Sequence, residues 1–218
     1  DRPDYSTAQT ATIIEVDRGR VKCLVEGPDG KKVITAMKAR ELGKKSVVVG
    51  DLVSIVGDIS GDEGSLARVV TVLPRKNSLT RSIDDHANDE RVIVANTDQM
   101  AIVIAAANPE PRVGLVDRAL VVTYDQGITP IIIMTKKDLA DGSDFLQIYK
   151  DLDILVFKID KSSDLTALQK VLLGKTTVLL GHSGVGKSTL VNNLLASSTN
   201  RASESLFEKI DQATGDVN

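Results

Sequence analysis

The sequence has 218 residues, of which 42% are hydrophobic and 26% charged, and its formal net charge is −3. This composition is ordinary for a globular protein. No apolar run approaches the roughly 18 residues of a membrane-spanning helix, and no signal peptide pattern begins the chain. The single cysteine, Cys23, excludes an intrachain disulfide, and with only two histidines the chain lacks the ligands for a clustered zinc site. We therefore expect a cytoplasmic protein that does not associate with membranes.

The first third of the chain has the pattern of an all-β domain. Short β-branched or alternating runs, separated by turn signals, fall at 11–16, 20–26, 31–37, 47–58 and 66–73. About five short strands in residues 10–75 predict a small closed barrel, such as an OB-fold. We expect residues 1–9 to be a flexible tail and the polar residues 76–92 to be a linker with a mobile segment.

The predicted barrel is mildly basic and has no aromatic side chain. Residues 1–82 carry 14 Lys and Arg against 11 Asp and Glu, whereas the remainder of the chain is acidic. Proteins that bind single strands without sequence preference stack bases on aromatic rings, and none lies between Thr10 and Arg75. If the barrel binds nucleic acid, it should therefore use Lys and Arg on backbone phosphates and the shape of folded RNA.

From about residue 93 the pattern changes to alternating strands and helices. Continuous apolar runs at 100–107, 130–134, 154–157 and 176–180 predict buried strands. Segments 115–124, 145–152 and 165–173 have helical spacing, with Asp164 as the N-cap of the last. This alternation predicts a mostly parallel α/β sheet in residues 93–218.

A phosphate-binding loop follows the last of these strands. Gly181-x-x-x-x-Gly186-Lys187-Ser188 is the P-loop pattern, and the apolar run after it is compatible with a helix. Glycines let the backbone N–H groups approach a phosphate, and the helix start adds further donors. Lys187 would reach the β and γ phosphates as the catalytic cation, Ser188 would ligate Mg²⁺, and Thr189 would contact the α phosphate. The predicted nucleotide-binding residues here are Gly181, His182, Ser183, Gly184, Val185, Gly186, Lys187, Ser188 and Thr189.

A second motif follows the strand at 130–134. Thr135-Lys136-Lys137-Asp138 resembles the guanine-reading motif of GTPases, usually Asn-Lys-x-Asp. A carboxylate such as Asp138 can accept both adjacent N–H donors of guanine, which adenine lacks, so discrimination should be large. The Lys136 stem would lie along the base. Both motifs would lie at strand carboxyl ends, where open α/β sheets bind ligands.

The order of the two motifs is reversed relative to an ordinary GTPase, because Asp138 precedes Gly181. With the preceding barrel, this order closely resembles the circularly permuted GTPases of small ribosomal subunit biogenesis (RsgA type). The resemblance covers roughly residues 10–218 and is carried by four separated blocks, 48–51, 94–99, 115–118 and 180–192. It implies an N-terminal barrel that contacts ribosomal RNA, followed by a circularly permuted P-loop GTPase domain whose C-terminal part is incomplete here.

The family also implies an activity and partners. Such a protein binds GTP and GDP with Mg²⁺ and hydrolyses GTP faster on the small ribosomal subunit, late in its maturation. We expect a monomeric, cytoplasmic protein, with Zn²⁺ only in the family's C-terminal domain, which would lie past Asn218. The switch segments and the group that orients the attacking water would also lie there, so this chain should bind nucleotide better than it hydrolyses it.

The chain departs from the family pattern at two places in the base site. Thr135 replaces the usual Asn and offers one hydroxyl where an amide makes several hydrogen bonds, so guanine affinity could be lower. The family's Ser-Ala base-contact motif should fall near 156–163, where Ser162 or Ser163 is the candidate substitute.

Two alternative functions remain open at this point. A P-loop ATPase or kinase with an accessory barrel would use the same loop and leave residues 135–138 idle. A non-catalytic RNA-binding module would keep the nucleotide as a structural ligand. Nucleotide preference distinguishes the first from a GTPase, and binding that weakens steeply with salt would indicate phosphate contacts to RNA.

Overall fold

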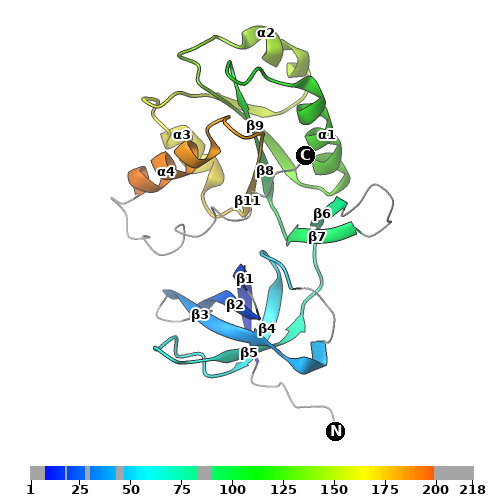
Figure 1. The fold of residues 1–218 in the computed structure, drawn as a ribbon, viewed down its shortest axis with the longest axis vertical. Coiled ribbons are helices and arrows are strands. Elements are labelled where there is room, and N and C mark those ends of the chain that lie inside the picture. Colours follow the sequence, from blue (N-terminus) through cyan, green and yellow to red (C-terminus); the bar gives the residue numbers. More distant parts are fainter. Residues whose placement is uncertain (1–7, 18, 28–29, 43–46, 83–89, 199–218) are drawn as a thin grey trace. The chain divides into compact units, whose positions relative to one another are not determined.

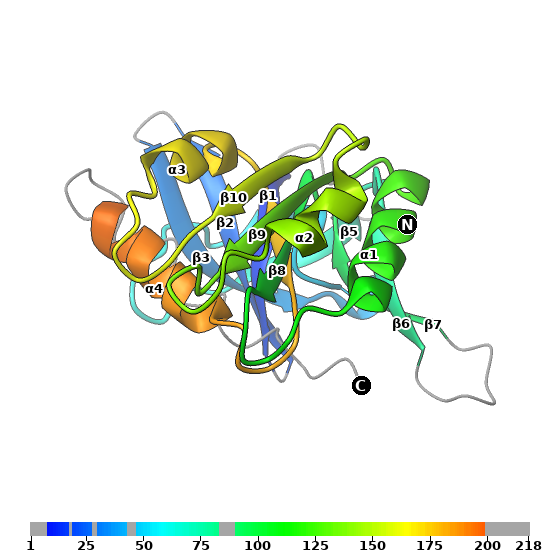
Figure 2. The same ribbon diagram turned by 90° about the horizontal axis from the view of Figure 1, so that it is seen from above.

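The structure is a computed structural model that describes residues 8–17, 19–27, 30–42, 47–82 and 90–198 (Figures 1 and 2). The chain divides into two compact units, Asp1–Asn96 and Thr97–Asn218. Most of the predicted flexible tail lies outside the described residues. None of the described helices is long and apolar enough to cross a membrane.

The first unit contains the predicted barrel. Its five strands close in the order β1-β2-β3-β5-β4, with antiparallel pairing except between β3 and β5. The bounds are β1 Gln9–Asp17, β2 Arg20–Gly27, β3 Gly30–Lys38, β4 Leu52–Gly57 and β5 Ala67–Val72, with a short 3₁₀ turn η1 at Arg40–Leu42. Alternate residues of each strand point inward and fill the barrel, among them the fully buried Ile13, Ile34 and Ile55. The prediction of a small OB-like barrel is confirmed.

Cys23 lies inside this barrel, completely buried. Burial in apolar surroundings raises the pKa of its thiol to about 12. The side chain is therefore a neutral packing group at physiological pH.

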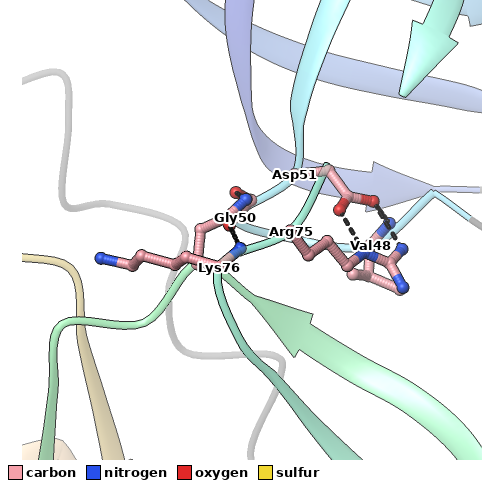
Figure 3. A network of polar contacts seen from close by, with 6 residues as sticks. Val48, Gly50, Asp51, Arg75 and Lys76 are labelled. Carbon is pink, nitrogen blue, oxygen red and sulfur yellow. Dashed lines mark hydrogen bonds and ion pairs between the residues drawn. The ribbon is translucent and has the colours of Figure 1, made fainter. Parts of the chain in front are cut away.

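The segment between β3 and β4 is where the barrel differs most from the sequence pattern. A strand with a glycine bend was predicted over 47–58. The chain does turn at Gly50, with a φ of 87°, but β4 begins only after this turn, at Leu52. Asp51, fully buried, accepts from Arg75 Nε at 2.7 Å and from the Val48 N–H at 2.9 Å (Figure 3). The ion pair is buried at Asp51 and partly exposed at Arg75, and it holds the start of β4 against the segment that follows β5.

A hairpin occupies the region that the sequence predicted to be a linker. β6 (Ser78–Ser82) pairs antiparallel with β7 (Glu90–Ala95), and the rest of the predicted mobile segment, 83–89, lies outside the described residues. Asn96 Nδ2, just past β7, donates to the Gly50 carbonyl at 2.8 Å. A Cβ on Gly50 would lie 2.0 Å from the Ala95 carbonyl oxygen, so only glycine allows this approach. The hairpin is thereby attached to the barrel.

The second unit is the predicted α/β domain. Its four strands are all parallel and lie in the order β10-β9-β8-β11. The strands are β8 Gln99–Ala105, β9 Thr129–Thr135, β10 Leu155–Lys158 and β11 Thr177–Leu180. β8 and β9 are buried almost throughout, which explains why they read as continuous apolar runs.

Helices cover both faces of this sheet (Figures 1 and 2). α1 (Val113–Asp125) lies on one face, and α3 (Thr166–Leu172) and α4 (Lys187–Ser198) lie on the other. The helix predicted over 145–152 is instead two short turns, α2 (Ser143–Leu146) and η2 (Gln147–Tyr149). Asp164 was predicted to be the N-cap of α3, but the N-cap is Leu165, one residue later, which makes no side-chain capping bond. Asp164 Oδ1 accepts from the Thr166 N–H at 2.9 Å, from one residue before the cap.

Candidate nucleotide-binding site

The two sequence motifs lie at the same edge of the parallel sheet. The guanine-type motif begins at Thr135, the last residue of β9, and the P-loop begins directly after Leu180, the last residue of β11. Both strands are hydrogen-bonded to β8, one on each side. Because parallel strands end at a common edge, both loops leave the sheet on the side where α/β folds bind ligands.

The P-loop needs its glycines for two different reasons. A Cβ on Gly181 would lie 2.4 Å from the Val103 carbonyl oxygen, so the loop leaves the sheet closer to β8 than any side chain permits. Gly186 has a φ of 94°, a conformation that residues with a Cβ rarely adopt. Val185 between them is 3% exposed and packs in the core, so only its backbone is available to a ligand.

The start of α4 carries the polar groups expected to meet phosphate and metal. Lys187 is the first helical residue, and its Nζ donates to the carbonyls of Gly181 at 2.7 Å and His182 at 2.9 Å. Ser188 and Thr189 follow in the first turn with exposed side chains. Helix N–H groups without intrahelical partners and the positive end of the dipole favour an anion here. His182 is half-buried and Ser183 exposed.

Thr135 joins the two motifs. Its hydroxyl lies 2.6 Å from the Val185 carbonyl of the P-loop and 3.2 Å from the Ile104 carbonyl of β8. A hydroxyl has one proton, so the shorter contact to Val185 is the stronger hydrogen bond. At 6% exposure this bond is shielded from water. Thr135, which stands in place of the usual Asn, therefore links the loop of the guanine-type motif to the P-loop.

The rest of the guanine-type motif lies at the surface. Lys136 adopts a φ of 55°, and its ammonium donates to the Asn108 carbonyl in the loop after β8. The Lys137 N–H donates to the Ile159 carbonyl at 3.2 Å. Asp138 is exposed, so a ligand in solvent can reach its carboxylate.

The loop after β10 lies beside this motif and is organised by Asp160. Its Oδ1 accepts from the hydroxyls of Ser162 at 2.8 Å and Ser163 at 2.9 Å. The Ser162 hydroxyl and backbone N–H hold the pKa of Asp160 down at about 2. Lys137 Nζ lies 3.7 Å from Asp160 Oδ2. Both serines proposed as base contacts thus turn their hydroxyls toward this carboxylate.

The donor set suits a nucleoside di- or triphosphate with Mg²⁺. Within the described ranges, no three His, Cys, Asp or Glu side chains are grouped so as to hold a metal ion. A hydroxyl such as that of Ser188 suits Mg²⁺, which takes few protein ligands and keeps waters and substrate phosphates around it. The roles predicted for Lys187, Ser188 and Thr189 stay predictions on this geometry.

The sequence did not reveal two elements of the site. The Asn108 carbonyl and the Asp160 carboxylate both contact the guanine-type motif from other loops. A main-chain acceptor has no signature in a sequence. For Asp160, the only signal was its position in the segment 156–163, shortly after a predicted strand.

Comparison with known proteins agrees with this architecture. The RsgA GTPase family model matches residues 72–212. A small ribosomal subunit biogenesis GTPase RsgA from Variovorax paradoxus is 37% identical over 186 residues, 81% of this chain and 54% of that protein. The crystal structure of YjeQ from Thermotoga maritima superimposes with a TM-score of 0.67 at 25% identity, covering 86% of this chain and 65% of that one. The structure of YloQ, described as a circularly permuted GTPase, gives a TM-score of 0.65 at 28% identity, covering 92% and 68%.

The curated relatives are longer than this sequence. The chain spans about half the length of those it matches, 54% of the Variovorax protein and 56% of one from Alkaliphilus metalliredigens. The matched region nevertheless covers well over half of the chain and includes both nucleotide motifs in their reversed order. The chain belongs to the RsgA GTPase family.

Proposed function

We propose that this chain is the barrel and guanine-nucleotide-binding part of a GTPase that acts in late maturation of the small ribosomal subunit. It would bind GTP and GDP with Mg²⁺, hydrolyse GTP, and be stimulated by the subunit. The protein would work in the cytoplasm as a monomer. Zn²⁺ would belong only to the C-terminal domain that the family resemblance implies.

The hydrogen bond from Thr135 to the Val185 carbonyl supports this proposal most directly. At 2.6 Å it joins the loop with the guanine-type motif to the loop with the P-loop motif. A nucleotide needs both, because one loop would read the base and the other would hold the phosphates. An ATPase that left residues 135–138 idle would not require this bond.

The chain's own residues would act mainly by positioning. Lys187 would leave the carbonyls of Gly181 and His182 and turn its ammonium to the β and γ phosphates, where negative charge develops as the phosphoryl group transfers. Ser188 would hold Mg²⁺, which neutralises phosphate charge when bound. Asp138 would accept the two guanine donors. Backbone N–H groups of 183–188 would surround the diphosphate.

The barrel would contact ribosomal RNA. Lys31 and Lys32 are exposed on β3 and would reach backbone phosphates by leaving their present partners, the Glu26 carboxylate at 2.7 Å and the Ser60 carbonyl at 3.5 Å. Each neutralised phosphate releases counterions, so the affinity for RNA should fall steeply as salt rises. RNA binding that does not change with salt would contradict this mode of contact.

Nucleotide preference tests the proposal. The chain is titrated with fluorescent GDP in the presence of Mg²⁺ and competed with GTP, ADP and xanthosine diphosphate, then the titration is repeated with Asp138→Asn. We expect guanine to be preferred and the variant to shift preference toward xanthine, since an Asn amide can donate to the extra carbonyl. Glu110→Gln provides a matched control, because it also replaces an exposed carboxylate with an amide, in the loop after β8.

Each outcome has a defined meaning. ADP binding equal to or stronger than GDP binding would overturn the GTPase assignment and favour an ATPase or kinase. Guanine preference without any GTP turnover by the full-length protein in the presence of small subunits would favour an RNA-binding module that uses the nucleotide as a structural ligand. Guanine preference that Asp138→Asn leaves unchanged would refute the role of Asp138.

A further inference from the structure

We propose that Asn108, in the loop that follows β8, is a positioning residue of the nucleotide site. Its backbone carbonyl would hold the Lys136 ammonium so that the lysine stem lies ready along the face of the base. The inference rests on the proposed guanine-nucleotide function and adds a third loop to the two that carry sequence motifs.

The sheet order places this loop between the two motifs. β8 lies between β9, which leads to the guanine-type motif, and β11, which leads to the P-loop. The loop after β8 contacts the guanine-type motif and approaches the P-loop. The Lys136 ammonium donates to the Asn108 carbonyl, and Pro109 Cδ lies 3.9 Å from the position that a Cβ on Gly184 would take.

The backbone at this contact is unusual on both sides. Among the described residues, only Asn96, Asn108 and Lys136 have a positive φ without being glycine. Asn108, with a φ of 47°, and Lys136, with a φ of 55°, are the two partners of this one hydrogen bond. Such conformations persist only where the surroundings fix them, and they gather at functional sites. A lysine at a freely exposed turn would have no reason to adopt one.

Holding Lys136 in advance would favour nucleotide binding. A lysine side chain has many rotamers, and ordering it when the base arrives would reduce affinity. A charge-assisted bond to a fixed carbonyl orders the side chain before binding. The effect should therefore appear for ligands that carry a base and not for inorganic pyrophosphate, which contacts only the phosphate loop.

Two variants remove the contact from opposite sides. Lys136→Met keeps an apolar stem of similar length but loses the ammonium. Asn108→Val places a β-branched residue at a positive φ, which should displace the carbonyl. Each should weaken GDP binding by roughly three- to thirtyfold, the range of a charged hydrogen bond at a partly exposed position. Glu110→Gln, two residues beyond Asn108, should stay within about twofold of the parent chain.

The double variant makes the test specific. If Asn108 acts through Lys136, Asn108→Val should add nothing to the effect of Lys136→Met. The affinity for pyrophosphate, measured by its displacement of GDP and corrected for the GDP affinity of each variant, should be the same in every variant. Urea unfolding of each chain shows whether it folds. If Asn108→Val does not fold, a more flexible loop that combines Asn108→Gly with Pro109→Gly replaces it, with a weakening of about threefold expected from the loosened carbonyl.

The failure of this inference and that of the proposed function give different results. Additive effects of the two substitutions, or GDP affinity unchanged in folded single variants, would overturn the role of Asn108 while leaving guanine preference intact. Equal binding of ADP and GDP by the parent chain would overturn the proposed function itself, and with it the proposed contact between Lys136 and a guanine base.

Discussion

The hydroxyl of Thr135 can be removed with almost no change of shape. Thr135→Val replaces it with a methyl group, so the Val185 carbonyl loses the donor that lies 2.6 Å away. Thr135 is 6% exposed and Val185 3%, so little water is available to replace the lost bond. Leaving a buried acceptor without its partner costs about 1 to 3 kcal/mol. We expect the second unit to be destabilised by that amount.

Nucleotide affinity should fall by more than stability alone explains. The Val185 carbonyl belongs to the P-loop, and its bond to Thr135 holds that loop in the conformation that would surround a diphosphate. If the freed loop spends most of its time in other conformations, the same 1 to 3 kcal/mol appears as a roughly 5- to 150-fold weaker GDP affinity. Fluorescent GDP titration and urea unfolding of the same preparation measure both quantities.

Thr135→Ser separates the hydroxyl from the methyl group. Serine keeps the donor and loses one buried methyl, worth about 0.8 kcal/mol of stability. We expect GDP affinity within about threefold of the parent chain. If Thr135→Val binds GDP as the parent does, or if both variants lose affinity equally, the hydroxyl does not join the loops and the reasoning is refuted.

Three further changes test other parts of the structure. Gly181→Ala places a Cβ 2.4 Å from the Val103 carbonyl oxygen and should destabilise the second unit by about 2 kcal/mol or more in urea unfolding; a near-neutral effect would show that the loop can move away. Arg75→Met leaves the fully buried Asp51 carboxylate without its ion-pair partner and should cost about 3 kcal/mol, so a barrel that unfolds at the parent's urea midpoint would contradict that pairing. The pKa of Asp160 is lowered from 3.8 to about 2 in the folded chain, so the stability that its carboxylate contributes is present above pH 3.8 and is lost as pH falls toward 2. Asp160→Asn should therefore make the free energy of unfolding depend less on pH between 2 and 3.8. If that pH dependence does not change, Asp160 is not one of the groups that cause it.

The strands that the sequence predicted well are those whose pattern follows directly from burial. β8 and β9 are buried along their length and read as apolar runs, and the inward-facing residues of the barrel strands alternate with outward-facing ones. β6 has no such pattern. Its sequence, Ser78-Leu-Thr-Arg-Ser82, is mostly polar, and it is a strand because β7 supplies its hydrogen bonds. A two-stranded hairpin of this kind leaves little periodic signal.

The site divides in the same way. The P-loop and the guanine-type motif were visible in the sequence because each is defined by residue type. The P-loop is defined by glycines, which have no side chain, and the guanine-type motif by the side chains of a Lys and an Asp after a strand. The contacts that hold the motifs together end on main-chain carbonyls, at Val185 for Thr135 and at Asn108 for Lys136. Any residue can provide a carbonyl, so only the fold determines which one is in place. The sequence showed a Thr at 135 in place of the usual Asn, but not that its hydroxyl has a carbonyl acceptor in the P-loop; the lower guanine affinity expected from this change stays a prediction.

The reversed order of the motifs has no consequence for the geometry of the site. Each strand of the sheet is parallel to its neighbours, so all of them end at one edge whatever their order in the chain. What the site needs is that β9 and β11 flank the same strand, and both are hydrogen-bonded to β8. Thr135 can then reach Val185 across the end of β8, 50 residues away in sequence. Adjacency in the sheet, and not the succession of motifs, therefore determines whether a base loop and a phosphate loop can act on one nucleotide.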